Sequence, residues 1–102
     1  MKIPKIDYTP DEELTDLFER NKEIVFDRFL YCIRDGFEKD LKDITVFELG
    51  ETGYFLETNI EDWCDSLNCC ITYFSIIEDY EKCIECKDLQ KKINERREQA
   101  AK

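Results

Sequence analysis

Histidine is missing from this chain of 102 residues, and cations are outnumbered, with 15 Lys and Arg against 25 Asp and Glu. Without an imidazole, Ser-His and Cys-His nucleophiles and metal sites of the HExxH type are excluded. The net charge of −10 argues against direct binding to nucleic acid or to an anionic membrane, because both need a basic face. The longest apolar-leaning run, Cys69–Ile77, has nine residues, and a membrane-spanning helix needs about 20.

Length and composition predict one folded domain over residues 1–102, since apolar residues make up 42% of the chain and aromatic residues 13%. Residues 1–8 are predicted to form an extended N-terminal segment. They lack the apolar core of a secretory signal, so we expect a cytoplasmic protein, in the host cell if the chain is phage- or virus-encoded. In a reducing cytosol the six cysteines are expected to be free thiols.

A long helix is predicted near the N-terminus. Thr9 and Glu12 form a capping-box pattern, and Pro10 between them suits the first helical position. Apolar residues then recur at helical spacing. Gly36 is the predicted C-terminal stop, with Arg34 in the last turn.

A β-hairpin is predicted next, from Ile44–Leu49 and Tyr54–Thr58, joined by four residues that include two glycines. If Leu49 lies opposite Tyr54, side chains alternate between a core face and a solvent face. The core face carries Thr45, Phe47, Leu49, Tyr54, Leu56 and Thr58. The solvent face carries Val46, Glu48, Phe55 and Glu57.

The rest of the chain is predicted to be one or two helices packed on one face of the hairpin, which gives an α+β fold. Its apolar seam comprises Ile60, Trp63, Leu67, Cys70, Phe74 and Ile77. The seam fails beyond Ile77, so a break is expected near Asp79–Cys83, followed by a polar helical tail over residues 83–102 that carries Ile84, Leu89 and Ile93. Because Cys69–Ile77 is rich in β-prone residues, a third strand there is the alternative.

The acidic residues are concentrated in one segment. Asp43–Glu81 contains ten acids and no Lys or Arg, whereas the rest of the chain holds 15 of each sign. Such a segment can be a solvated surface, or it can bind a basic partner through complementary charge. For the second interpretation the predicted partner-binding residues are Glu48, Glu51, Phe55, Glu57, Glu61, Asp62, Asp65, Glu78, Asp79 and Glu81.

The cysteines give only weak metal candidates. Cys83 and Cys86 form a CxxC motif, but no second CxxC and no nearby glycine supports a zinc site. Acidic neighbours, Glu81 and Glu85 among them, do not favour a reactive thiolate. We therefore expect no cofactor, and cysteines that act as small apolar side chains.

These patterns predict a non-catalytic protein, since three glycines, no phosphate-binding loop and no nucleophile motif leave little basis for an active site. The chain resembles, in charge and size and through no motif, the small acidic inhibitors of phages and mobile elements and the acidic immunity proteins. That resemblance implies a basic, nucleic-acid-handling protein as partner, inhibited by an anionic face that mimics nucleic acid. Two alternatives remain: an assembly module that oligomerises through its C-terminal helix, and a small Cys-ligated metal protein.

Overall fold

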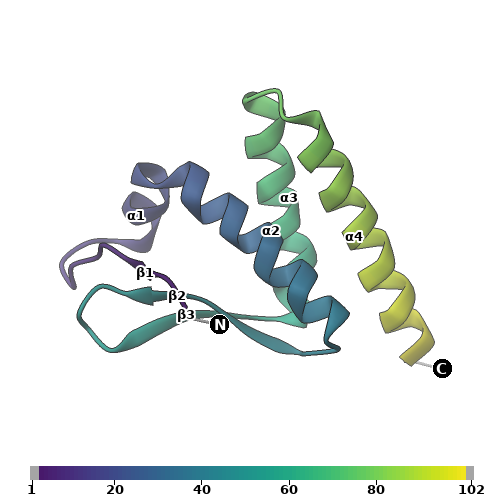
Figure 1. Cartoon of the computed structure of the whole chain (residues 1–102), viewed down its shortest axis with the longest axis horizontal. Coiled ribbons are helices and arrows are strands. Elements are labelled where there is room, and N and C mark those ends of the chain that lie inside the picture. The colour runs from purple at the N-terminus through teal and green to yellow at the C-terminus, as the bar shows by residue number, and fades with distance from the viewer. Residues whose placement is uncertain (1–2, 101–102) are drawn as a thin grey trace.

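Among the described residues, four helices lie on one side of a three-stranded sheet (Figure 1). The structure, a computed structural model, describes residues 3–100. Its elements are β1 (Lys5–Ile6), α1 (Leu14–Arg20), α2 (Lys22–Glu38), β2 (Asp43–Leu49), β3 (Tyr54–Asn59), α3 (Ile60–Ile76) and α4 (Tyr80–Ala100). The predicted α+β class is confirmed.

The sheet has the order β1-β2-β3, with β1 parallel and β3 antiparallel to β2. The third strand is therefore Lys5–Ile6, inside the segment expected to be extended. The alternative strand at Cys69–Ile77 is wrong, because the segment up to Ile76 belongs to α3. There, burial of Cys70 and Phe74 on one helical face outweighs the β propensity of the neighbouring residues.

The hairpin register is confirmed at its turn and shifts further along. Leu49 pairs with Tyr54 as predicted, but an irregularity between Thr45 and Phe47 leaves Val46 without a partner. Thr45 therefore faces Glu57, one residue from the predicted position. A β-bulge of this kind turns two successive side chains toward the same side. Val46, predicted to face solvent, is fully buried beside Phe47, and Thr45 is only half-buried.

The predicted N-terminal helix is two helices, and it begins later than predicted. Thr9 and Glu12 form a turn, in which the Glu12 N–H donates to the Thr9 carbonyl at 3.0 Å, and α1 begins only at Leu14. The Glu12 carboxylate pairs with Arg20 and does not return to cap a helix. The helix breaks at Asn21, whose side-chain amide donates to the Leu17 carbonyl at 3.0 Å and competes with the backbone ladder.

Gly36 does not end the helix, because it lies inside α2. A Cβ there would stand 2.6 Å from Ile44 Cγ2 and 3.2 Å from Trp63 Cη2, so glycine lets α2 approach the sheet and α3 closely. The helix ends instead in a Schellman motif, where Leu41 N–H donates to the Gly36 carbonyl at 2.8 Å and Asp40 has a φ of 57°.

A second Schellman motif separates α3 from α4. Asp79 N–H donates to the Phe74 carbonyl at 2.8 Å, and Glu78 takes the left-handed position with a φ of 62°. Asp79 then accepts from Lys82 N–H at the start of α4, at 3.4 Å. The predicted break is confirmed, but it begins at Ile77, two residues earlier than expected.

Replacing Glu78 by glycine is expected to raise the free energy of unfolding by about 1 kcal/mol, because glycine adopts the left-handed conformation without a Cβ clash. Chemical denaturation followed by circular dichroism measures the change. Glu78→Gln is the matched control, since it removes the same charge and keeps the unfavourable φ. Equal stabilities of the two variants would contradict this account.

One apolar core joins the sheet to the helices. The predicted seam is confirmed at Trp63, Leu67, Cys70 and Phe74, which are fully buried, whereas Ile77 is 48% exposed. The predicted polar tail belongs to α4 up to residue 100, and residues 101–102 lie outside the described part of the chain. This helix packs mainly on α3, whereas the prediction placed it on the hairpin. Its buried side chains are Cys83, Cys86, Leu89 and Ile93, whereas Ile84 is 67% exposed.

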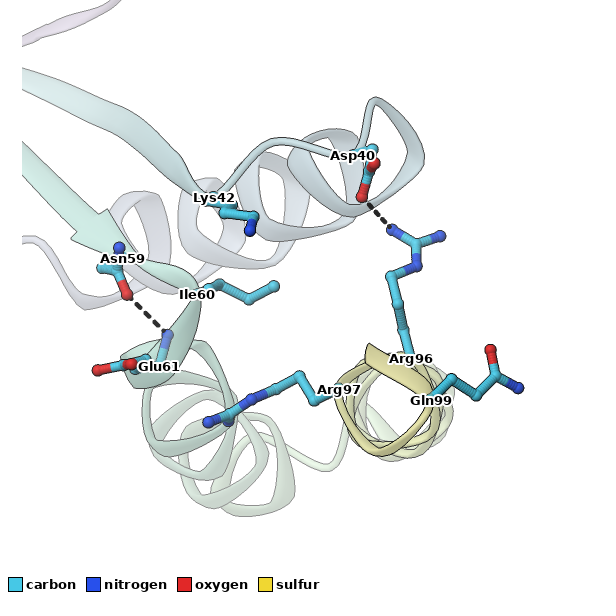
Figure 2. A pocket seen from close by; sticks show the side chains of 8 residues that line it. All are labelled: Asp40, Lys42, Asn59, Ile60, Glu61, Arg96, Arg97 and Gln99. Carbon is cyan, nitrogen blue, oxygen red and sulfur yellow. Dashed lines mark hydrogen bonds and ion pairs between the residues drawn. The ribbon is translucent and has the colours of Figure 1, made fainter. Parts of the chain in front are cut away.

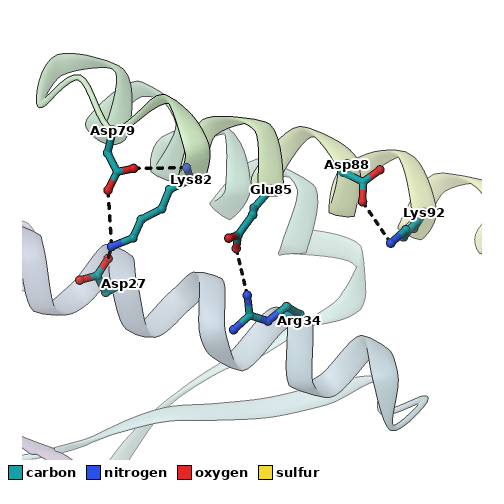
Figure 3. A network of polar contacts seen from close by, with 7 residues as sticks. All are labelled: Asp27, Arg34, Asp79, Lys82, Glu85, Asp88 and Lys92. Carbon is teal, nitrogen blue, oxygen red and sulfur yellow. Dashed lines mark hydrogen bonds and ion pairs between the residues drawn. The ribbon is translucent and has the colours of Figure 1, made fainter.

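Ion pairs fix α4 against α2 (Figure 3). Lys82 Nζ lies 2.7 Å from Asp27 Oδ1, and Arg34 Nη1 lies 2.9 Å from Glu85 Oε2. The hydrogen bond to Asp27 raises the pKa of Lys82 above its usual value. These pairs are partly exposed, so we assign them mainly to the orientation of α4 and little to stability.

Candidate functional site

Part of the predicted partner-binding set meets on the outer face of the sheet. Glu48 of β2 lies directly opposite Phe55 of β3, and Glu57 follows two residues later on the same face. All the helices of Figure 1 lie on the other side, so no helix between residues 3 and 100 covers this face. We call Glu48, Phe55 and Glu57 the sheet patch.

The sheet patch contains a large exposed aromatic side chain. Phe55 is 48% exposed, as its predicted place on the solvent face implies. Tyr54, predicted to face the core, is 72% exposed because it stands at the end of β3 beside the turn. Sequence reasoning missed this tyrosine, and its position next to a glycine turn was the signal that could have revealed it.

A cation of β1 lies beside the sheet patch. Lys5 is the register partner of Glu48, but its Nζ pairs with Glu51 Oε1 at 3.0 Å. The hydrogen bond and charge of Glu51, with a smaller effect of Glu48, raise the pKa of Lys5. The charge of Glu51 is therefore compensated, whereas Glu48 and Glu57 form no ion pair with any residue between 3 and 100.

A second group of predicted acids lies at the start of α3. Glu61, Asp62 and Asp65 are all exposed, and Glu61 and Asp65 are one helical turn apart. Asn59 caps the helix, because its side-chain oxygen accepts from Glu61 N–H at 3.0 Å. Acids in the first turn also stabilise the positive end of the helix dipole, so Glu61 and Asp62 have a structural role besides any binding role.

The third group lies at the opposite end of α3, around the turn that leads to α4. Glu78 and Glu81 are exposed, whereas Asp79 is half-buried and pairs with Lys82 at 3.7 Å. The 17 residues of α3 separate this group from the second by about 25 Å at 1.5 Å per residue. The ten predicted residues thus occupy both ends of α3 and the sheet, and they do not form a single compact site.

A groove of about 970 Å³ lies between the start of α3 and the end of α4 (Figure 2). Lys42 and Arg97 line it from opposite sides, with Ile60 between them. Arg96 also lines the groove, where it pairs with Asp40 at 3.4 Å. It stacks 3.7 Å from the centre of the Phe37 ring and donates to the Phe37 carbonyl at 2.8 Å. Cations therefore flank the second acidic group, which makes that part of the surface mixed in sign.

The weak metal candidates are core side chains. Cys83 and Cys86 are buried between α4 and α3, and Cys83 Sγ lies 3.6 Å from the Ile71 carbonyl. A hydrogen bond with Cys86, together with burial, raises the pKa of Cys70. The described residues form no group of three or more His, Cys, Asp or Glu side chains suited to a metal ion.

Comparison with protein-family models, curated protein sequences and solved structures finds no match to this chain. Among the helices between residues 3 and 100, none combines the length and apolar composition needed to cross a bilayer.

Proposed function

We propose that this chain is a non-catalytic binding protein that inhibits or modulates a basic, nucleic-acid-handling protein through the sheet patch. The observation that carries the proposal is the exposed Phe55 beside two glutamates that have no ion pair among residues 3–100, on a sheet face that no helix of those residues covers. Burial of the aromatic side chain against the partner increases the affinity. The flanking carboxylates orient the partner and increase the association rate.

The charge distribution supports a basic partner. Glu48 and Glu57 lie in a segment without a single Lys or Arg, and Lys5, which stands beside Glu48, pairs with Glu51. A cationic surface approaching the sheet patch gains favourable charge interactions with both side chains. Nucleic acid as a direct ligand would instead meet like charge. When carboxylates occupy a cationic groove of the partner that otherwise binds phosphates, nucleic acid is excluded from that groove. This competition gives the inhibition a physical basis.

The two alternatives have less support. An assembly module would use the C-terminal helix, but Leu89 and Ile93 are buried within the chain, which leaves Ile84 as the large apolar side chain that α4 exposes beyond its first residue. A metal protein would use Cys83 and Cys86, which are packed against α3.

The proposal is tested by affinity capture from the native host lysate, with elution in rising salt and identification of the bound protein. A basic nucleic-acid-handling protein is expected to elute at moderate salt, because screening weakens interactions between exposed charges. The triple variant Glu48→Gln, Phe55→Ser, Glu57→Gln is expected to bind the purified partner about 30-fold more weakly, which corresponds to about 2 kcal/mol.

The matched control is the triple variant Glu23→Gln, Ile24→Ser, Glu95→Gln, which removes the same number of charges and one exposed apolar side chain elsewhere. All three residues are exposed, and Ile24 is 58% exposed. Affinity within about twofold of wild type is expected for this control. An equal loss in both triple variants, or in neither, would refute the sheet patch as the binding surface.

A further inference from the structure

A concentration of exposed apolar side chains marks the turn between α3 and α4. Ile76 is 75% exposed, Ile77 48%, Tyr80 59% and Ile84 67%. We call these four residues the tip. Single exposed apolar residues are ordinary on protein surfaces, but four large ones within nine positions of the sequence are not.

The tip residues are oriented outward by the local backbone. Tyr80 and Ile84 are one turn apart on the same side of α4, opposite the buried Cys86. Ile76 lies on α3 away from the buried Phe74. The Schellman motif at Glu78 fixes the turn, so these side chains stay exposed on a defined scaffold. None of the four side chains is part of the apolar core.

The unpaired charges at the turn itself are negative. Glu78 and Glu81 are exposed and form no ion pair with any residue of the described chain. Two cations lie nearby: Lys82 is occupied by Asp27 at 2.7 Å and Asp79 at 3.7 Å, whereas Lys87, three residues beyond Ile84 on α4, is exposed and forms no ion pair among the described residues. The tip is therefore an apolar patch whose rim is anionic beside Ile77 and Tyr80 and carries one free lysine beyond Ile84.

The charge of this rim favours one kind of partner over another. In a symmetric dimer formed through Ile76, Ile77 and Tyr80, Glu78 and Glu81 of both copies would be brought together, and the one free lysine per copy, Lys87, offsets only part of that charge. A Lys- or Arg-rich partner that also presents apolar side chains satisfies both parts of the surface. Charge complementarity thus favours a basic protein segment over a second copy of this chain.

We infer that the tip is a second docking surface, which receives an amphipathic basic segment of the partner in the same complex as the sheet patch. The inference rests on the proposed function, since it assumes a basic partner. It adds an apolar contact that the sequence did not reveal, at the end of the molecule farthest from the sheet (Figure 1).

The test uses two synthetic 16-residue helical peptides as probes, one with Lys on one side and Leu on the other, and one with every Leu replaced by Gln. Fluorescence anisotropy measures their binding to the full chain. We expect the Lys–Leu peptide to bind at least tenfold more tightly. The double variant Ile76→Ser, Ile84→Ser is expected to lose that preference. The control variant Ile24→Ser, on α2, is expected to retain it.

Circular dichroism verifies that the variants are folded, which the exposure of all three substituted residues predicts. Equal binding of the two peptides, or an unchanged preference in Ile76→Ser, Ile84→Ser, would overturn the inference. So would wild-type dimers in sedimentation that the double variant loses, because the tip would then receive a second copy. The proposed function is judged separately by the sheet-patch variant, so the two failures are distinguishable.

Discussion

Trp63→Ala is expected to lower the free energy of unfolding by about 3–5 kcal/mol, the range for deleting a buried aromatic side chain. The indole is fully buried at the meeting point of α2, α3 and the sheet. It lies next to Gly36, and its Nε1–H donates to the Thr58 carbonyl at 3.3 Å. The substitution therefore leaves both a cavity and a carbonyl without its donor.

Urea denaturation followed by circular dichroism at 222 nm measures this loss, because the variant retains no tryptophan for fluorescence. Trp63→Phe is expected to be intermediate, since it keeps most of the apolar volume and loses the N–H donor. Tyr80→Ala, at a 59% exposed aromatic, is the control and should change stability by less than about 0.5 kcal/mol. A loss below about 1 kcal/mol for Trp63→Ala would show that the core is not organised around the indole.

The sequence predicts those elements whose burial pattern is regular. The seam from Trp63 to Phe74 follows helical spacing, and each of its members is buried as expected. The hairpin is predicted equally well at its turn, where two glycines set the pairing of Leu49 with Tyr54. In both cases the local pattern and the tertiary packing require the same conformation.

The errors arise where packing overrides a local signal. Gly36 has the appearance of a helix stop, but close contact with Ile44 and Trp63 requires glycine within α2. The ends of α2 and α3 lack glycine, because Asp40 and Glu78 occupy the left-handed positions instead. The bulge at Val46 leaves no mark in the sequence, since it depends on pairing with a strand ten or more residues away.

The sheet patch is predictable from the sequence, whereas the tip is not. Alternation along the hairpin places Glu48, Phe55 and Glu57 together on one face, and the register confirms that arrangement. The exposure of Ile76 and Ile84 depends on where α3 ends and on which side of α4 contacts α3. Those two facts are set by tertiary packing, so the tip could not be recognised from apolar periodicity.

Gly50→Ala is expected to destabilise the fold by about 3 kcal/mol through the loss of β1. Gly50 has a φ of +53°, and a Cβ there would lie 2.3 Å from the backbone oxygen of Tyr8. Left-handed strain alone costs about 1–2 kcal/mol. The clash is with backbone, so it cannot be relieved by a side-chain rotation, and the N-terminal segment must move. Movement would expose Ile6, whose burial contributes about 1.5–3 kcal/mol.

Gly53→Ala separates these two effects, because Gly53 also has a positive φ, of +81°, but has nothing within 4 Å of its Cβ position. It is expected to cost only the backbone strain, about 1 kcal/mol. Amide hydrogen exchange supplies the structural readout, since Glu48 N–H donates to the Pro4 carbonyl and Gly50 N–H to the Ile6 carbonyl. Both amides should exchange quickly in Gly50→Ala and slowly in Gly53→Ala. Slow exchange in both variants would mean that β1 tolerates a side chain at the turn, and that its attachment does not depend on glycine.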